Sequence, residues 1–142
     1  AHGCACASAW SAMEDALRAL GVRRIALGTP YPAAVHALAP DFFAAAGFEL
    51  SGHATLDILA MRDVPEVRPD RLAAFVQALP RAGAEAIVLL ATDLPCFRAI
   101  AALERATGLP VLTSNQVLLW RALRLAGHAG RIQGLGRLLE AH

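Results

Sequence analysis

Short apolar segments alternate with longer segments of helical periodicity, and this alternation most constrains how the chain can fold. The apolar segments 24–28, 84–90 and 110–113 lack the regular polar alternation of half-exposed strands, and 48–56 is a further extended segment. Helical spacing of apolar residues marks segments 8–20, 70–79, 94–108 and 114–125. Strands separated by helices are typical of a parallel sheet covered on both faces. The sequence therefore predicts an α/β fold, a three-layer sandwich around a mainly parallel four-stranded sheet.

Proline and glycine mark the less regular parts of the chain. Residues 32–46 have a helical pattern that Pro40 interrupts, so we expect a kink or two shorter helices there. The length suits one α/β domain over residues 1–142. Within it we expect an irregular connection at 57–69 and a C-terminal tail at 127–142 with a short final turn.

The composition argues against several classes of function. All 13 basic residues are arginine, so lysine Schiff-base chemistry is excluded within this chain. The arginines are scattered without interleaved aromatic residues and the net charge is +1, so we expect no nucleic-acid partner. The apolar runs are too short to cross a bilayer, and no signal-peptide pattern opens the chain. We therefore expect no membrane partner and a cytoplasmic location.

The three cysteines do not form a recognisable metal or redox motif. The spacing of Cys4 and Cys6 fits neither a C-x-x-C pair nor a zinc knuckle, although His2 could join them around a metal ion. We predict ordinary reduced thiols and no metal site. Cys96 allows two interpretations: a buried apolar residue, or a first-turn nucleophile with a lowered pKa.

The carboxyl ends of three predicted strands are the candidate ligand site, because ligands bind at this edge of open parallel sheets. A helix is expected soon after each strand, and the free N–H groups of its first turn favour a carboxylate ligand. Ser114 and Asn115 could instead be helix caps, and Tyr31 could simply cover the sheet edge. The candidate residues are Thr29, Pro30 and Tyr31; Ala91, Thr92, Asp93 and Leu94; and Thr113, Ser114 and Asn115.

Several stretches resemble one enzyme family. Residues 16–31 read ALRALGVRRIALGTPY, residues 103–116 read LERATGLPVLTSNQ, and residues 134–139 read GLGRLL. In this order they resemble the maleate isomerases and arylmalonate decarboxylases, members of the aspartate/glutamate racemase superfamily. The resemblance implies one Rossmann-like half of a fold in which two similar α/β halves hold a ligand. It also implies cysteine chemistry without a metal or cofactor, on a small carboxylic or dicarboxylic acid.

The resemblance also implies roles for single residues. Tyr31 corresponds to the family's tyrosine that donates a hydrogen bond to the substrate carboxylate, and Thr29 and Pro30 shape the same strand end. The family's cysteine falls at Ala91, followed by Thr92, Asp93 and Leu94, so the expected thiol is absent. Cys96 is then a candidate relocated nucleophile, whereas Ser114 and Asn115 are candidate substrate-binding residues.

Members of the resembled family are about twice as long as this chain, consistent with two α/β halves. The half without a counterpart in this chain is the first, which carries another catalytic residue in the family. The expected partner is therefore a missing N-terminal half or a second copy of the chain. Three hypotheses follow: an isomerase- or decarboxylase-like domain with little activity alone, a non-catalytic carboxylate-binding or regulatory module like ectoine-utilisation relatives, or an enzyme that uses Cys96.

Overall fold

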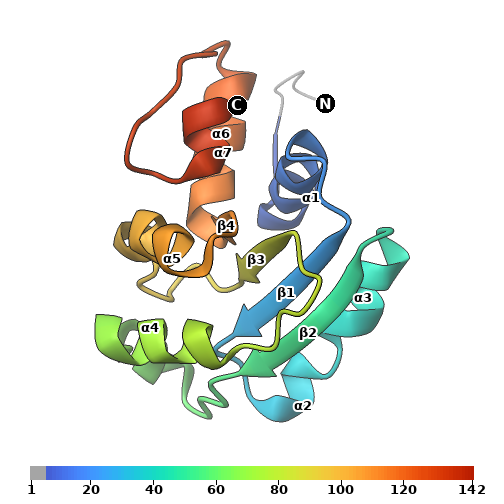
Figure 1. The fold of residues 1–142 in the computed structure, drawn as a ribbon, viewed down its shortest axis with the longest axis vertical. Helices are drawn as coiled ribbons and strands as arrows, with labels where there is room; N and C mark the ends of the chain where they lie inside the picture. Colours follow the sequence, from blue (N-terminus) through green and yellow to red (C-terminus); the bar gives the residue numbers. More distant parts are fainter. Residues whose placement is uncertain (1–5) are drawn as a thin grey trace.

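The computed structural model describes residues 6–142 as a parallel sheet between two layers of helices (Figure 1). The strand order is β2-β1-β3-β4, and every neighbouring pair is parallel. The strands are β1 (Arg24–Thr29), β2 (Glu49–Thr55), β3 (Ala86–Leu89) and β4 (Val111–Thr113). The predicted α/β sandwich with a four-stranded sheet is confirmed.

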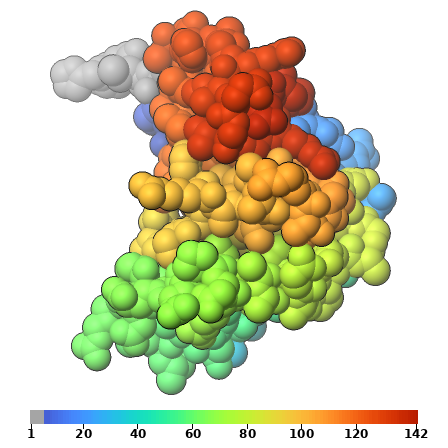
Figure 2. All heavy atoms as spheres, turned by 60° about the vertical axis from the view of Figure 1, so that its left-hand side comes forward, coloured from blue at the N-terminus to red at the C-terminus, as the bar shows by residue number. Residues whose placement is uncertain are grey.

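Two apolar clusters, one on each face of the sheet, form the core. Ile25, Leu27 and Val88 face the first cluster, which is covered by α1 (Ala9–Ala19), α3 (Ala39–Ala45), α6 (Ser114–Leu125) and α7 (Arg137–Ala141). Ile87 and Leu89 face the second cluster, which is covered by α4 (Pro69–Ala78) and α5 (Ile100–Thr107). Alternate residues of one strand thus enter different clusters, as the pleat of a strand requires. Figure 2 shows α4 in green and α5 in orange side by side on the second face.

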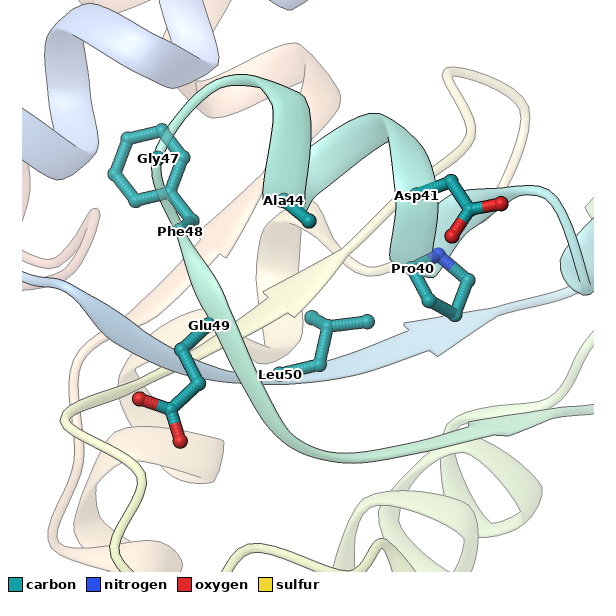
Figure 3. A pocket seen from close by; sticks show the side chains of 7 residues that line it. All are labelled: Pro40, Asp41, Ala44, Gly47, Phe48, Glu49 and Leu50. Atoms are coloured by element: carbon teal, nitrogen blue, oxygen red, sulfur yellow. The ribbon is translucent and has the colours of Figure 1, made fainter.

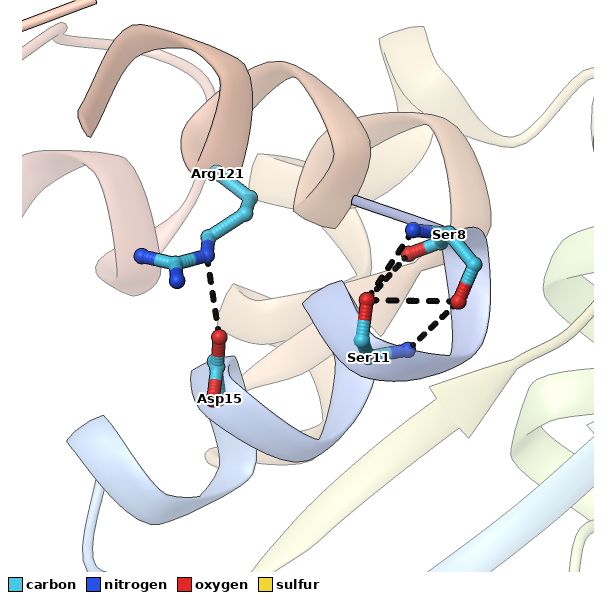
Figure 4. A network of polar contacts seen from close by, with 4 residues as sticks. All are labelled: Ser8, Ser11, Asp15 and Arg121. Carbon is cyan, nitrogen blue, oxygen red and sulfur yellow. Dashed lines mark hydrogen bonds and ion pairs between the residues drawn. The ribbon is translucent and has the colours of Figure 1, made fainter. Parts of the chain in front are cut away.

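The first layer is held by the packing of α1 against α6 (Figure 4). Ser8 and Ser11 form a capping box that satisfies N–H groups at the start of α1. Asp15 of α1 and Arg121 of α6 form an ion pair of 2.9 Å. These contacts hold α1 against α6. Because a helix that precedes a parallel strand runs antiparallel to it, the N-terminal end of α1 lies beside the carboxyl edge of the sheet.

The break expected near Pro40 is confirmed, because two short helices, α2 (Ala33–His36) and α3, replace one long helix. Pro40 lies in the first turn of α3, where N–H groups make no hydrogen bond within the helix, so proline breaks none there. Residues 61–66 within the expected irregular connection form a 3₁₀-helix, η1 (Met61–Glu66). Asp70 is a residue type that often caps a helix, but α4 begins at Pro69, and the Asp70 carboxylate instead pairs with Arg68 at 3.1 Å.

The expectation that Leu94-Pro95-Cys96 opens a helix is wrong. The Cys96 N–H donates to the Leu94 carbonyl at 2.8 Å, which closes a tight turn around Pro95. A short 3₁₀-helix, η2 (Phe97–Ala99), follows, and α5 starts only at Ile100. The residue before a proline avoids the helical region, so the chain turns here before the helix can begin.

The C-terminal segment packs back onto the core. Leu138 and Leu139 of α7 are buried in the first cluster. The buried Glu104 carboxylate accepts N–H bonds from Val111 at 3.0 Å and from Arg137 at 3.0 Å, which ties α5, β4 and α7 together. Over residues 6–142, the structure contains no helix with the length and apolar character needed to cross a membrane.

Candidate functional site

A cavity of about 230 Å³ lies at the carboxyl edge of the sheet. Its volume is below the range typical of sites for drug-sized ligands, roughly 300 Å³ and above, so it suits a small molecule. Among the predicted site residues, Tyr31, Ala91, Thr92 and Ser114 line it together, although they come from three separate strand ends. The complete lining consists of Ala9, Trp10, Met13, Tyr31, Leu90, Ala91, Thr92 and Ser114.

The cavity wall contains hydroxyl groups but no charged side chain. Tyr31, Thr92 and Ser114 provide the hydroxyls, and the remaining lining side chains are apolar. Ser114 is also the first residue of α6, whose first-turn N–H groups lack carbonyl partners within the helix. The positive end of a helix dipole beside hydroxyl donors favours an anion. A carboxylate can therefore be bound here by neutral donors.

Residues 91 and 92 are tied to the first turn of α6. The Ala91 N–H donates to the Ser114 hydroxyl at 3.2 Å, and the Asn115 side-chain amide donates to the Thr92 carbonyl at 2.8 Å. Ala91 has a φ of +98°, which is strained for a residue with a Cβ. The strain and the two hydrogen bonds define a sharp, fixed turn after β3.

The alternative that Ser114 or Asn115 caps α6 is wrong. Thr113 is the N-cap, and its hydroxyl accepts from the Gln116 N–H at 3.3 Å. The Gln116 side-chain oxygen accepts from the Thr113 N–H at 3.2 Å, which completes a capping box. The cap at Thr113 leaves the side chains of Ser114 and Asn115 to bind the turn after β3.

Tyr31 has a phenol that stays protonated at neutral pH. Burial raises the pKa of Tyr31 above its usual value of 10.0, and the nearby negative charge of Asp93 raises it further. Asp93 itself is exposed and lies outside the cavity lining. A protonated phenol in the wall is a hydrogen-bond donor for an anion.

The other predicted site residues lie outside the cavity wall. Thr29 is fully buried, and its hydroxyl lies 2.9 Å from Nδ1 of His36. Leu94 is part of the second apolar cluster, and Pro30 is absent from the lining. For Thr29, Pro30, Asp93, Leu94 and Asn115, contact with a substrate stays a prediction.

A hydrogen-bonded chain runs from Thr29 to the surface. Nδ1 of the buried His36 contacts the Thr29 hydroxyl, and its Nε2 lies 2.9 Å from Nδ1 of His53 on β2. Both ring nitrogens of His36 are therefore engaged in hydrogen bonds. Burial lowers the pKa of His36 below 6.5, and the proximity of His53 lowers it further.

Acidification is expected to destabilise the fold through His36. Below pH 6.5 the unfolded chain takes up the proton first, so the free energy of unfolding falls as the pH drops toward the lowered pKa of folded His36. The slope contributed by one proton is at most about 1.4 kcal/mol per pH unit. Urea unfolding between pH 7.5 and 5.5 measures it. H36Q should flatten the slope and H128Q should not; equal slopes in all three proteins would contradict the assignment.

Cys96 lies in the core and away from the cavity lining. Its side chain is 2% exposed within the second apolar cluster. Burial raises the pKa of the Cys96 thiol to about 11, although a hydrogen bond with Thr113 partly lowers it. The proposed role of Cys96 as a nucleophile stays a prediction. The thiolate is the reactive form of cysteine, and a buried thiol with this pKa forms very little thiolate at neutral pH.

Limited treatment with iodoacetamide at pH 7 is expected to modify the exposed Cys6 well before Cys96. A thiol with a pKa of about 11 is almost entirely protonated at this pH, and the core excludes the reagent. Mass spectrometry of quenched time points measures both rates, and a urea-unfolded sample shows that Cys96 can react once exposed. If Cys96 is labelled faster than Cys6 in the folded protein, the result would support Cys96 as the nucleophile.

The part of the chain that the structure describes contains no group of three metal-binding side chains. His2 and Cys4, which the sequence suggested as partners of Cys6, lie outside the described residues.

The sequence prediction missed half of the cavity wall, namely Ala9, Trp10, Met13 and Leu90. Trp10 and Met13 lie on the inward face of α1, a pattern that indicates only burial. The useful signal was topological: a helix that precedes a parallel strand begins at the carboxyl edge of that strand. This rule places the start of α1 at the ligand-binding edge.

A larger cavity of about 460 Å³ lies between α3 and β2 (Figure 3). Its wall includes Pro40 and Ala44 of α3 and Phe48, Glu49 and Leu50 at the start of β2. The start of β2 is at the amino edge of the parallel sheet, opposite the edge where such sheets bind ligands. Its wall is largely apolar, with no group of polar donors comparable to Tyr31, Thr92 and Ser114. The smaller cavity is therefore the better candidate.

Comparison with known sequences gives one consistent result. The family model of arylmalonate decarboxylase matches residues 1–139. The arylmalonate decarboxylase of Bordetella bronchiseptica is 34% identical over 143 residues, which cover 99% of this chain and 60% of that protein. The maleate isomerase of Geobacillus stearothermophilus is 29% identical over 134 residues, covering 94% of this chain and 53% of the relative.

Solved structures give the same picture. A liganded mutant of arylmalonate decarboxylase has a TM-score of 0.89 at 31% identity, covering 96% of this chain and 60% of that one. A mutant of the Nocardia farcinica maleate cis-trans isomerase with a covalently bound succinylcysteine intermediate has a TM-score of 0.90 at 27% identity, covering 95% of this chain and 56% of that one. The chain thus spans between about half and 60% of the length of these relatives.

Proposed function

Because this chain belongs to the arylmalonate decarboxylase family, we propose that its cavity binds one carboxylate of a small carboxylic or dicarboxylic acid. The observation that carries the proposal is that three hydroxyl-bearing residues, Tyr31, Thr92 and Ser114, line one cavity, and that Ser114 begins α6. Donors of this kind match the oxygens of a carboxylate or of an oxyanion that forms from it. The small volume of about 230 Å³ supports a small acid over a nucleotide.

Each hydroxyl has a distinct proposed role. The Tyr31 phenol, protonated at neutral pH, donates to one carboxylate oxygen. Ser114 accepts from the Ala91 N–H, which leaves its own hydroxyl proton free to point at the ligand. The apolar side chains of Trp10 and Met13 line the same cavity, where they exclude water and strengthen these hydrogen bonds. Together they hold the acid without any basic side chain.

The chain is further proposed to bind its ligand without turning it over on its own. The resemblance puts the reactive cysteine of the family at position 91, where this chain has alanine. Among the described cysteines, Cys96 is buried and Cys6 lies on the N-terminal side of α1. A carboxylate-binding or regulatory module fits this arrangement.

A second α/β half is the proposed partner. The chain spans about half of its relatives, and an apolar stripe of exposed side chains, Val35, Leu38 and Phe42, runs along α2 and α3. The Phe42 ring contacts the ring of Trp10, which itself lines the cavity. A covering half over this stripe would bury apolar surface and close the cavity. Light scattering of the chain alone distinguishes a self-paired copy, which would appear as a dimer, from a separate half.

Isothermal calorimetry with malonate, maleate and phenylmalonate tests the proposed ligand class. We expect binding by the unmodified chain and a loss of about tenfold in affinity in Y31F, since one hydrogen bond to a charged group is worth about 1.5 kcal/mol or more. S51A, a substitution on β2 away from the cavity, serves as the control and should bind as the unmodified chain does. If the unmodified chain binds none of the three acids, the proposed ligand class is wrong.

Replacement of Asp93 by asparagine is expected to tighten the binding of a dicarboxylate several-fold. The Asp93 carboxylate lies close enough to raise the pKa of Tyr31, so it also repels an anion bound to the phenol. The same substitution should lower the Tyr31 pKa. Calorimetry at two ionic strengths measures the effect, which should shrink in high salt because Asp93 is exposed. D63N, an exposed carboxylate on η1, is the matched control, and an equal gain there would contradict the assignment.

A further inference from the structure

The loop that carries Tyr31, residues 30–33, is bound along its backbone by a second segment, residues 55–58. This segment begins at the last residue of β2, Thr55, which pairs with Thr29 at the end of β1. The Leu56 N–H donates to the Thr29 carbonyl at 2.9 Å, and the Ile58 N–H donates to the Pro30 carbonyl at 2.9 Å. Pairing between the two chain segments therefore continues past the ends of the strands.

Two side chains of the same segment bind the backbone of the loop at Tyr31 and Ala33. The Thr55 hydroxyl donates to the Tyr31 carbonyl and accepts from the Asp57 N–H at 3.0 Å. The Asp57 carboxylate accepts from the Ala33 N–H at 2.7 Å. Asp57 has a φ of +50°, an uncommon conformation for a residue other than glycine, which its tight local bonding stabilises.

These contacts leave the Tyr31 loop little freedom. Loops at strand ends are generally more mobile than the strands they follow. Here the carbonyls of Thr29, Pro30 and Tyr31 and the N–H of Ala33 all bond to residues 55–58. The direction of the Tyr31 side chain is then set by its own rotamer alone, and the ring packs against the second apolar cluster.

We propose that Thr55 and Asp57 are positioning residues, which hold the Tyr31 phenol at the cavity wall for hydrogen bonding to a carboxylate. The inference rests on the proposed function for the role of Tyr31, but the hydrogen bonds that carry it are independent of any ligand. Neither Thr55 nor Asp57 lines the cavity, so they act through Tyr31 and not by contact with the acid. A phenol held in place before the ligand arrives loses less conformational entropy on binding.

The single tyrosine of the chain makes this inference directly testable. Incorporation of 3-fluorotyrosine puts one fluorine label at Tyr31, whose phenol then titrates at a lower pH than tyrosine and away from alkaline unfolding. The variants are T55V and D57A, which remove the side-chain hydrogen bonds, and T55S and D57N, which keep an equivalent hydroxyl or accepting oxygen. Fluorine NMR gives the phenol pKa and the number of ring environments, and calorimetry with malonate gives the affinity.

We expect T55V and D57A to lower the raised phenol pKa toward that of free fluorotyrosine and to weaken malonate binding about tenfold. T55S and D57N should keep both close to the values of the unmodified chain. Unchanged pKa values in T55V and D57A would overturn the proposal, as would equal shifts in all four variants, which would indicate general loosening of the fold. If the unmodified chain binds no malonate, the proposed function fails, whereas the fluorine titration still decides the positioning role.

Discussion

Cysteine in place of Ala91 is expected to react with iodoacetamide at pH 7 at least about 100-fold faster than Cys96 does. A thiol with an ordinary pKa is a few per cent thiolate at this pH, whereas a thiol with a pKa of about 11 is roughly one part in ten thousand thiolate. Position 91 also lines the cavity beside the Ser114 hydroxyl and the first turn of α6, both of which favour the thiolate. Tandem mass spectrometry of the labelled peptide locates the modified residue.

Serine at position 91 is the matched control for this experiment, because it has nearly the same size and the same backbone strain but no thiol. A91S should gain no label at position 91. Saturating malonate should slow the labelling of A91C if the acid occupies the same cavity. Ala91 is 5% exposed and borders the cavity, so the prediction requires that the reagent reach position 91 through the cavity. A rate for A91C no higher than that of Cys96 would contradict both this access and the assignment of position 91 as the family's thiol position.

The second large effect is expected at Gly52, where alanine should destabilise the fold by about 3 kcal/mol. A Cβ at this position would lie 2.2 Å from the Pro80 carbonyl oxygen, which is backbone and cannot rotate away. The pairing of β1 with β2 shifts register between Ile25 and Ala26, so β2 contains one extra residue just before Gly52. The bulge brings the glycine against the segment that follows α4.

Thermal unfolding followed by circular dichroism measures this effect, and a Tm lower by about 10 °C is expected for G52A. S51A, at the neighbouring bulge residue, changes the same strand without the backbone clash and should unfold within a few degrees of the unmodified chain. A Tm for G52A equal to that of S51A would show that the two segments can move apart without cost.

The sequence was sufficient to predict the strands and the layers. The apolar segments around Ile25 and Ile87 lack polar alternation because both faces of β1 and β3 are covered. This pattern can be recognised in a single sequence. Pro40 likewise predicted a break, because its effect on a helix is local. Features that depend on one residue and its neighbours along the chain can therefore be predicted from the sequence alone.

The details that failed depend on competition between neighbours or on tertiary packing. Thr113, Ser114 and Asn115 are three consecutive good caps, and the strand end selected Thr113 because Gln116 could complete the capping box. The helix expected at Leu94 was displaced by the turn around Pro95. Trp10 lines the cavity because of tertiary packing, in which its ring contacts Phe42 and Phe43 of α3, and no local sequence pattern predicts these contacts.

The cavity wall draws on residues from Ala9 to Ser114, so it exists only while the whole sheet and α1 are assembled. Ligand binding and global unfolding are therefore thermodynamically linked. A ligand at 100 times its Kd raises the free energy of unfolding by about 2.7 kcal/mol. A library of small acids can thus be ranked by the rise in Tm, without an assay for any reaction. At equal concentration, the acid that raises the Tm most is the one that binds most tightly.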